Sequence, residues 1–183
     1  MARAKTSNGA KPRRITKRKA VEDHARSYFD ALAARDAEGM LEHWHEDGVV
    51  DLVPLGVFRG REEIGGFFTE LFAALPDLET TVTRLVAGER EAAVEWRMSG
   101  HFTGTPFQGI DATGRPVHMR GIDLIEIEDG KNVSNTAYYD GMAFARQIGL
   151  MPAQDSGAER AMMGAFNAAT RVRRAVADRM AAR

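Results

Sequence analysis

Hydrophobic residues recur at helical spacing in the first part of the chain. Between residues 20 and 35 the apolar positions fall three and four residues apart, which places them on one face of a helix. Residues 37–44 predict a second short helix, which Asp47 and Gly48 end. Residues 61–75 repeat the same spacing with several phenylalanines and predict a third helix.

Alternating and β-rich segments dominate the middle of the chain. Residues 48–58 predict one or two extended pieces, interrupted by Pro54 and Gly56. After Pro76, four β-rich runs separated by turn signals follow at 78–88, 91–102, 115–128 and 131–140. Consecutive strands joined in this way predict an antiparallel meander.

The order of helices first and strands afterwards is typical of the α+β class, in which a curved antiparallel sheet wraps a layer of helices. Near the C-terminus, Ser156 and Glu159 have capping-box spacing and open a long amphipathic helix. We expect its apolar stripe to pack on the body of the domain, or to be covered by a partner subunit. The predicted divisions are a basic disordered tail (1–19), one domain (20–152) and the C-terminal helix (153–183).

Composition narrows the possible functions. The 183 residues contain no cysteine, which excludes disulfides, thiolate nucleophiles, Cys-ligated zinc and iron–sulfur clusters. No apolar run approaches twenty residues, so we expect no membrane span. No apolar stretch follows Arg3 and Lys5 before the first helix, so we expect no secretory signal and a cytoplasmic location.

The first 19 residues carry eight basic side chains and no acid, which leaves the rest of the chain near −9. Such a tail could contact nucleic acid or another acidic surface. No aromatic residue is interleaved with the charges, so a solvated disordered leader is the favoured interpretation. A nucleic-acid partner is not expected.

A set of turn and strand motifs resembles a known family. The motifs are the spacing of Gly100, Gly104 and Gly109, the turn Thr113-Gly114-Arg115, the strand segment Gly121-Ile122-Asp123, the turn Asp129-Gly130-Lys131, and Asp140. Together with the element order, they make residues 20–152 resemble the SnoaL-like polyketide (ester) cyclases of the nuclear transport factor 2-like superfamily. The resemblance implies a cone-like fold around an apolar pocket, a small apolar or polycyclic ligand, and commonly a homodimer through the opposite sheet face.

Two departures from the family pattern bear on the substrate. The family's loop often reads Gly-Thr-His-Thr-Gly, whereas here Phe102 aligns with the histidine and His101 is shifted by one residue. In a strand, that shift sends the imidazole to the other face. Asn135 and Thr136 also replace the Glu and Trp content that is usual in the last strand. The resemblance to the family therefore does not imply a polyketide substrate for this chain.

Two aspartates are the candidate catalytic residues. Asp140 aligns with the family's acid/base aspartate, and an apolar pocket would raise its pKa toward a useful range. Its alternative role is the N-cap of a helix starting at Gly141. Asp123 shares a strand face with Val117 and Ile125, so we expect it inside the pocket. Its alternative is an ion pair with an arginine at a dimer contact.

Aromatic residues supply the predicted pocket walls, because they combine apolar area with hydrogen-bonding tips. The candidates for the substrate pocket are Tyr28, Trp44, Trp96, His118, Tyr138 and Tyr139. Period-two counting nevertheless puts His118 on the opposite strand face, with Arg120 and Glu126, where a solvated or subunit-facing surface is favoured.

No metal or other cofactor is predicted. His43 and His45 lie two apart on a predicted helix and would point in different directions. The glycines lie in β-turns rather than between a strand and a helix, so they predict no nucleotide site.

The leading functional hypothesis is a cofactor-independent cyclase or isomerase of the SnoaL-like type, with Asp140 as acid/base and Asp123 assisting. The alternative is a non-catalytic ligand-binding or scaffold module, since the fold alone does not decide activity. A third hypothesis is an enzyme like limonene epoxide hydrolases or ketosteroid isomerases. Ala137 argues against the epoxide hydrolase, because it aligns with one of that family's aspartates.

Overall fold

The computed structural model describes residues 17–181, so almost all of the predicted basic tail lies outside the described residues. Eleven elements follow one another in the described chain. In order they are α1 (Lys17–Ala34), α2 (Ala37–Glu42), β1 (Trp44–Leu52), β2 (Gly56–Arg59), α3 (Gly60–Ala74), β3 (Glu79–Ala87), β4 (Glu91–His101), β5 (Pro116–Glu128), β6 (Lys131–Tyr139), α4 (Gly141–Gln147) and α5 (Gly157–Ala181).

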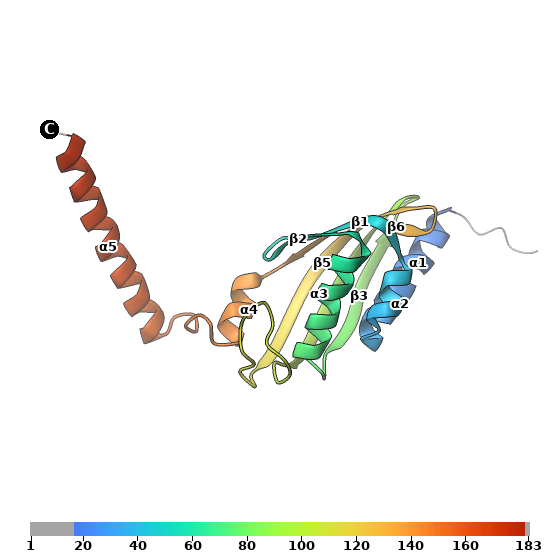
Figure 1. Cartoon of the computed structure of the whole chain (residues 1–183), viewed down its shortest axis with the longest axis horizontal. Helices are drawn as coiled ribbons and strands as arrows, with labels where there is room; N and C mark the ends of the chain where they lie inside the picture. Colours follow the sequence, from blue (N-terminus) through green and yellow to red (C-terminus); the bar gives the residue numbers. More distant parts are fainter. Residues whose placement is uncertain (1–16, 182–183) are drawn as a thin grey trace, which may run out of the picture.

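The strands form one curved six-stranded sheet in the order β2-β1-β6-β5-β4-β3 (Figure 1). The predicted antiparallel meander is confirmed for β3 through β6. The pairing of β1 with β6 is parallel, with Val50 opposite Asn135 and Leu52 opposite Ala137. A sheet made wholly of antiparallel pairs was expected, and no local signal marks the parallel pair because its two strands lie far apart in the sequence.

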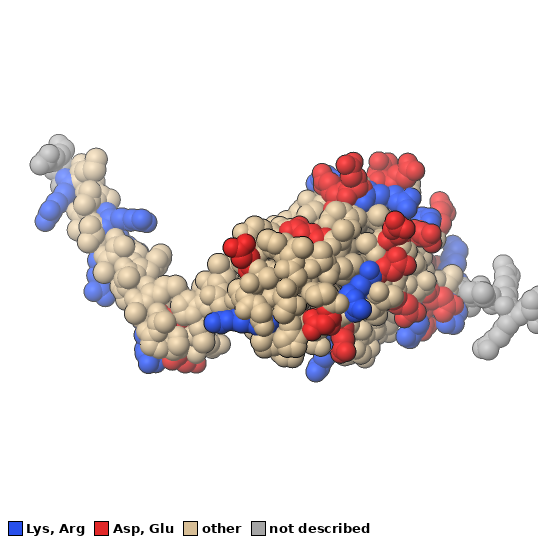
Figure 2. Space-filling model, turned by 60° about the horizontal axis from the view of Figure 1, so that its bottom comes forward, with Lys and Arg blue, Asp and Glu red and all other residues tan. Residues whose placement is uncertain are grey.

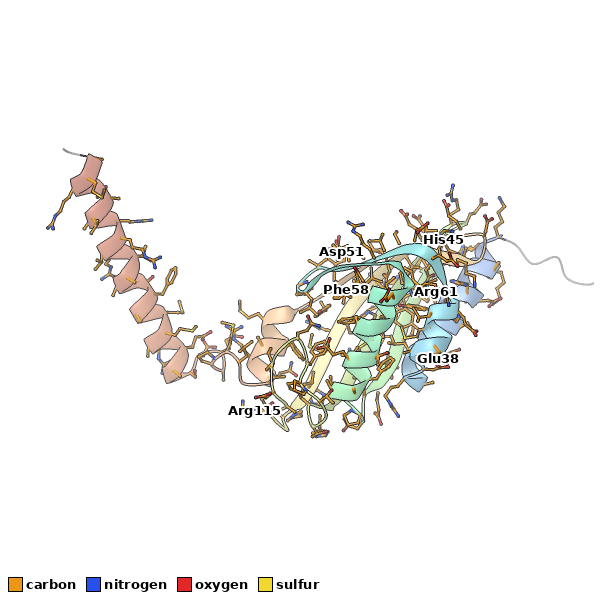
Figure 3. All side chains as sticks on the ribbon, viewed as in Figure 1. Glu38, His45, Asp51, Phe58, Arg61 and Arg115 are labelled. Atoms are coloured by element: carbon orange, nitrogen blue, oxygen red, sulfur yellow. The ribbon has the colours of Figure 1, made fainter. Side chains whose placement is uncertain are left out.

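Helices α1 and α3 cover the concave face of the sheet, α1 over β3 and α3 over β1 (Figure 1). Their buried side chains are the predicted apolar stripes, including Tyr28 and Phe29 on α1 and Ile64 and Phe67 on α3. Each large apolar side chain removed from water contributes roughly 1.5–3 kcal/mol to folding. On β2, Phe58 packs against Phe67 with ring centroids 4.9 Å apart, which joins the sheet edge to α3 (Figure 3).

The second helix is shorter than its sequence pattern predicts. Asp36 caps it by accepting a hydrogen bond from the backbone N–H of Gly39 at 2.9 Å, and the helix ends at Glu42. Trp44, which was expected on this helix, instead begins β1 and is 1% exposed. A short helix has few internal hydrogen bonds, so pairing of the next residues with β6 decides where it stops.

Helix α5 does not pack on the body, contrary to the first expectation from sequence. It extends away from the α4 end of the sheet (Figure 1), and none of its residues is buried. The predicted capping box is present, because the N–H of Glu159 donates to Ser156 Oγ at 3.1 Å. Glu159 also pairs with Arg146 of α4 at 2.6 Å, which holds the first turn of α5 beside α4.

Candidate active site

A cavity of about 590 Å³ lies between the concave face of the sheet and helices α1, α3 and α4. Its wall is mostly apolar, with Leu32, Phe67, Phe68, Leu71, Met98 and Met119 among the lining residues. A cavity of this size and character suits a drug-sized, largely apolar ligand. The few polar groups that reach it therefore decide what chemistry it can support.

Asp123 on β5 is the buried carboxylate of this cavity. Strand alternation places it on the inner face between Gly121 and Ile125, and it is 7% exposed. Trp96 Nε1–H on β4 donates to Asp123 Oδ1 at 2.7 Å, and Asn135 Nδ2–H on β6 donates to Asp123 Oδ2 at 2.6 Å. Each oxygen keeps a second lone pair, so the carboxylate can still accept a proton from a ligand.

Burial dominates the ionisation of Asp123. Removal from water raises the pKa of the carboxyl to about 6, although the hydrogen bonds from Asn135 and Trp96 favour the charged form and limit the rise. At neutral pH the carboxyl is thus mostly ionised, with a pKa close to the working pH. This is the condition under which a carboxylate is most effective as a general base.

Tyr28 and Tyr139, two of the residues expected in the pocket wall, line the cavity near this carboxylate. Burial and the negative charge of Asp123 raise the pKa of Tyr28 well above its ordinary value, although Trp44 and Asn135 lie close enough to oppose the rise. The same two causes raise the pKa of Tyr139 to about 12. Both phenols therefore stay neutral at physiological pH and can donate a hydrogen bond to a ligand oxygen.

Asn135 and Gly121 complete the site, and sequence reasoning gave neither of them a role in it. Asn135 is 2% exposed, and its Oδ1 is a buried acceptor without a well-formed hydrogen bond. Nearby, Trp44 Nε1 is a buried donor that also lacks one. Gly121 lies opposite Trp96, and a Cβ there would approach the Trp96 ring to 2.4 Å and the Tyr138 carbonyl oxygen to 2.6 Å. The glycine thus leaves the space that Trp96 occupies while it donates to Asp123.

Asp140 lies at the mouth of the cavity, where β6 ends and α4 begins. Its side chain is exposed, and Oδ1 accepts a hydrogen bond from the Ala143 N–H at 2.9 Å. The N-cap role weighed in the sequence is therefore present in the structure, while its other oxygen remains open. The structure does not bring Asp140 into the Asp123 hydrogen-bond network within the described residues.

Three further residues predicted to line the pocket lie outside it. Tyr138 is 47% exposed because Ala137 and Tyr139, its neighbours on β6, face inward. His118 is exposed on the outer face for the same reason, between Val117 and Met119 of β5. Trp44 is buried behind Tyr28 rather than in the wall, with the two rings edge to face at 6.0 Å.

Residues 17–181 contain no group of three His, Asp or Glu side chains placed to hold a metal ion. The imidazoles of His24 and His43 lie 5.1 Å apart, but they bind Asn132 and Ser27 instead. In the described part of the chain, no helix is both long enough and apolar enough to cross a bilayer.

The curved sheet, the helical layer and the cavity between them define the cone fold of the nuclear transport factor 2-like class. The chain belongs to the SnoaL-like family within it, because that family's sequence profile, the SnoaL-like domain, matches residues 25–135. The matched segment holds Asp123, Trp96 and Asn135 and ends before Asp140.

Solved structures share the fold at low sequence identity. A protein from Jannaschia sp. CCS1, assigned as a SnoaL-like polyketide cyclase, is 20% identical over 79% of this chain and all of its own, with a TM-score of 0.67. AclR of Streptomyces galilaeus, assigned as a hydroxylase, is 20% identical over 74% of this chain and 99% of its own, with a TM-score of 0.65. IdmH of Streptomyces antibioticus, assigned as a polyketide cyclase, is 25% identical over 70% of this chain and 97% of its own, with a TM-score of 0.60. No curated protein matches the chain.

Proposed function

We propose that the protein is a cofactor-independent acid–base enzyme that removes a proton next to a carbonyl group of a polycyclic or polyketide-like ligand. The observation that carries the proposal is the buried Asp123 carboxylate, with a pKa raised to about 6, in an apolar cavity large enough for such a ligand. A raised pKa in a cleft is a recognised mark of functional carboxyls.

Each step of the proposed chemistry has a candidate group. Asp123 accepts the proton, and Trp96 and Asn135 hold its two oxygens in place. Tyr28 or Tyr139 donates a hydrogen bond to the enolate oxygen that forms, because both phenols remain protonated. Return of the proton to a different carbon gives isomerisation, and attack of the enolate on a second carbonyl gives cyclisation. Polyketide cyclisation is one of the reactions that begin with this proton removal.

The proton-abstraction step can be tested before the substrate is known. A panel of ring-shaped ketones and 1,3-dicarbonyl compounds is incubated with the protein in D2O, and exchange next to the carbonyl is followed by NMR. We expect protein-dependent exchange for one ring class, lost in Asp123→Asn and retained in Asp140→Asn. The reverse result would give the acid/base role to Asp140, and exchange that survives both substitutions would reject both carboxyls.

A non-catalytic ligand-binding module is the second candidate. It is favoured by the fact that Asp123 and Asp140 already have hydrogen-bond partners within the protein. A thermal-shift screen with the same panel separates the two functions. A ligand that raises the melting temperature by several degrees, shows no exchange and is released unchanged would support the binding module.

We also propose that the protein forms a homodimer. Support comes from the large apolar side chains that it exposes, among them Ile122, Leu124 and Tyr138 on the outer sheet face and Phe166 on α5. Light scattering at micromolar concentration tests this proposal, and a mass of one chain throughout would contradict it.

A further inference from the structure

Two exposed apolar surfaces of the chain lack a partner among the described residues. The first, the α5 stripe, consists of Met162, Phe166, Val172, Val176 and Met180, which are 41–74% exposed. The second, the mouth rim, surrounds the opening of the cavity and consists of Val53, Leu55, Met142 and Leu150, which are 41–61% exposed. The mouth rim includes Met142 of α4, and α5 is anchored to the same helix by the pair between Glu159 and Arg146.

The anchor of α5 keeps the stripe away from its own mouth rim. Glu159 accepts a hydrogen bond from Arg146 at 2.6 Å and one from the Asp155 backbone N–H at 2.6 Å. This ion pair is the most shielded of those described, with the two side chains 24% and 14% exposed. From this base the helix points away from the body (Figure 1), so the stripe is presented to another molecule.

The composition of the stripe favours a protein surface over a lipid surface. Ala165 lies three residues from Met162, and Ala169 lies three residues from Phe166, so both alanines share the helix face of the stripe. Small side chains allow a helix to approach another protein closely, whereas they gain little from insertion into hydrocarbon. Arg173 lies on the face of the stripe, seven residues from both Phe166 and Met180, and Arg179 borders it. The long side chain of Arg173 can pack its aliphatic stem in a contact and keep its charged head at the edge.

Charge favours a second copy of this chain as the partner. Helix α5 has five arginines and two acidic residues, whereas residues 20–156 have 24 acidic and 11 basic residues, a formal net charge of −13. Blue side chains follow α5 in Figure 2, and red ones gather on the body. A second copy therefore offers a body whose net charge is opposite to that of α5.

We propose that the α5 stripe of one copy packs across the mouth rim of a second copy and closes its cavity, reciprocally in a two-fold pair. This inference specifies the proposed homodimer and is independent of the proposed acid–base chemistry. A 25-residue helix is roughly 37 Å long, and covering a strip about 10 Å wide buries roughly 375 Å² on it and as much on its partner. Two such contacts bury about 1,500 Å², which is typical of stable interfaces.

The outer sheet face is less suited to the contact. Ile122 and Leu124 alternate with inward-facing residues there, and their cross-strand and same-face neighbours include Glu95, Arg120 and Glu126. Covering these residues would remove several charged groups from water, which offsets much of the gain from apolar burial. The α5 stripe has fewer charges on its face, where Arg173 is the charged residue, and an arginine can pack its aliphatic stem while its guanidinium stays in water.

The first test is the mass of the full-length protein in solution. By light scattering we expect about twice the 20.1 kDa chain mass for the wild type and one chain mass for Phe166→Asp. Asn167→Asp is the matched control, because it adds the same charge one residue away on the polar side of α5 and should remain dimeric. Circular dichroism checks that both variants are folded. A dimer that survives Phe166→Asp would overturn the proposal.

Cross-linking locates the contact, and the absence of cysteine makes it unambiguous. Phe166→Cys and Leu55→Cys chains with different tags are co-expressed and oxidised. We expect a disulfide between the two kinds of chain. Self-linked Phe166→Cys dimers would indicate pairing of two α5 helices, and an intrachain disulfide in the double variant would indicate closure over the chain's own mouth. Either result overturns the proposal.

Two further outcomes are decisive. Asp123→Asn should remain dimeric, so loss of the acid–base function and loss of the dimer are distinguishable. A monomeric wild type that sediments with phosphatidylserine vesicles, and fails to do so as Phe166→Asp, would assign the stripe to an anionic bilayer instead of a second copy.

Discussion

Asp123 and Asp140 are two carboxylates of one cavity, and their surroundings give them different chemistry. Asp123 lies in the middle of a strand, faces the interior and has only side-chain donors around it. Asp140 lies where a strand becomes a helix, is exposed and accepts a backbone N–H. Position within an element thus decides whether a carboxyl is removed from water with a raised pKa or used to start a helix.

The largest expected difference between the two sites is in proton transfer. Asp123→Asn should lower carbon–hydrogen exchange of a bound ketone by about 10²–10⁴-fold, the usual contribution of a positioned general base. Asp140→Asn should lower it by less than about 10-fold, because the amide can still cap α4. NMR exchange rates at saturating ligand measure both effects. Equal losses in the two variants would show that the carboxyls act together.

The pH dependence of stability should separate the two carboxyls next. The pKa of Asp123 rises from 3.8 to about 6 on folding, so between about pH 4 and pH 6 the folded chain holds more protons than the unfolded chain. The free energy of unfolding should therefore fall as pH rises through this window, by about 3 kcal/mol from this group. Denaturant titrations of wild type and Asp123→Asn should show the difference as a pH-dependent gap. Asp140→Asn should leave that dependence in place.

Filling the space beside Trp96 should disturb the buried site alone. Gly121→Ala would place a Cβ 2.4 Å from the Trp96 ring, and overpacking of this kind costs about 1–3 kcal/mol. The control is Gly66→Ala on α3, where a Cβ meets no atom within 4 Å and helix propensity should increase stability slightly. Thermal melts and Trp fluorescence measure both variants. An unchanged melting temperature and spectrum for Gly121→Ala would show that Trp96 moves freely.

The smallest expected effect concerns the cap. Asp140→Ala removes the acceptor for the Ala143 N–H and should cost about 1 kcal/mol, whereas Asp140→Asn should be nearly neutral. Amide hydrogen exchange at Ala143 and its neighbours in α4 reports the loss locally. Equal protection in the two variants would mean that the cap adds nothing to α4.

The fold could be predicted largely from local patterns, because the strands and helices follow hydrophobic periodicity. Asp123 was placed inside by counting every second residue, and the same counting would have placed Tyr138 outside, beside the inward Tyr139. Counting along β6 also places Asn135 inside, on the face of Ala137 and Tyr139, but its bond to Asp123 depends on the register of β5 against β6, which periodicity alone does not give. Gly104 was recognised as a turn, but its contact with the end of α3 at the Ala74 carbonyl oxygen is tertiary. The cytoplasmic location and the solvated basic tail stay predictions.

The parallel pairing of β1 with β6 has a consequence for the order of folding. Val50 of β1 pairs with Asn135 of β6, which lies 85 residues later in the chain, so β1 can join the centre of the sheet only after β6 is present. Such non-local contacts slow folding, because the entropy of a long loop is lost before the contact forms. On the ribosome, α1 and α3 emerge well before β6, so their apolar faces stay uncovered during synthesis. The hydrogen bond from Asn135 to Asp123 joins β6 to β5, so the wall of the cavity around Asp123 is complete only when the last strand of the sheet is in place.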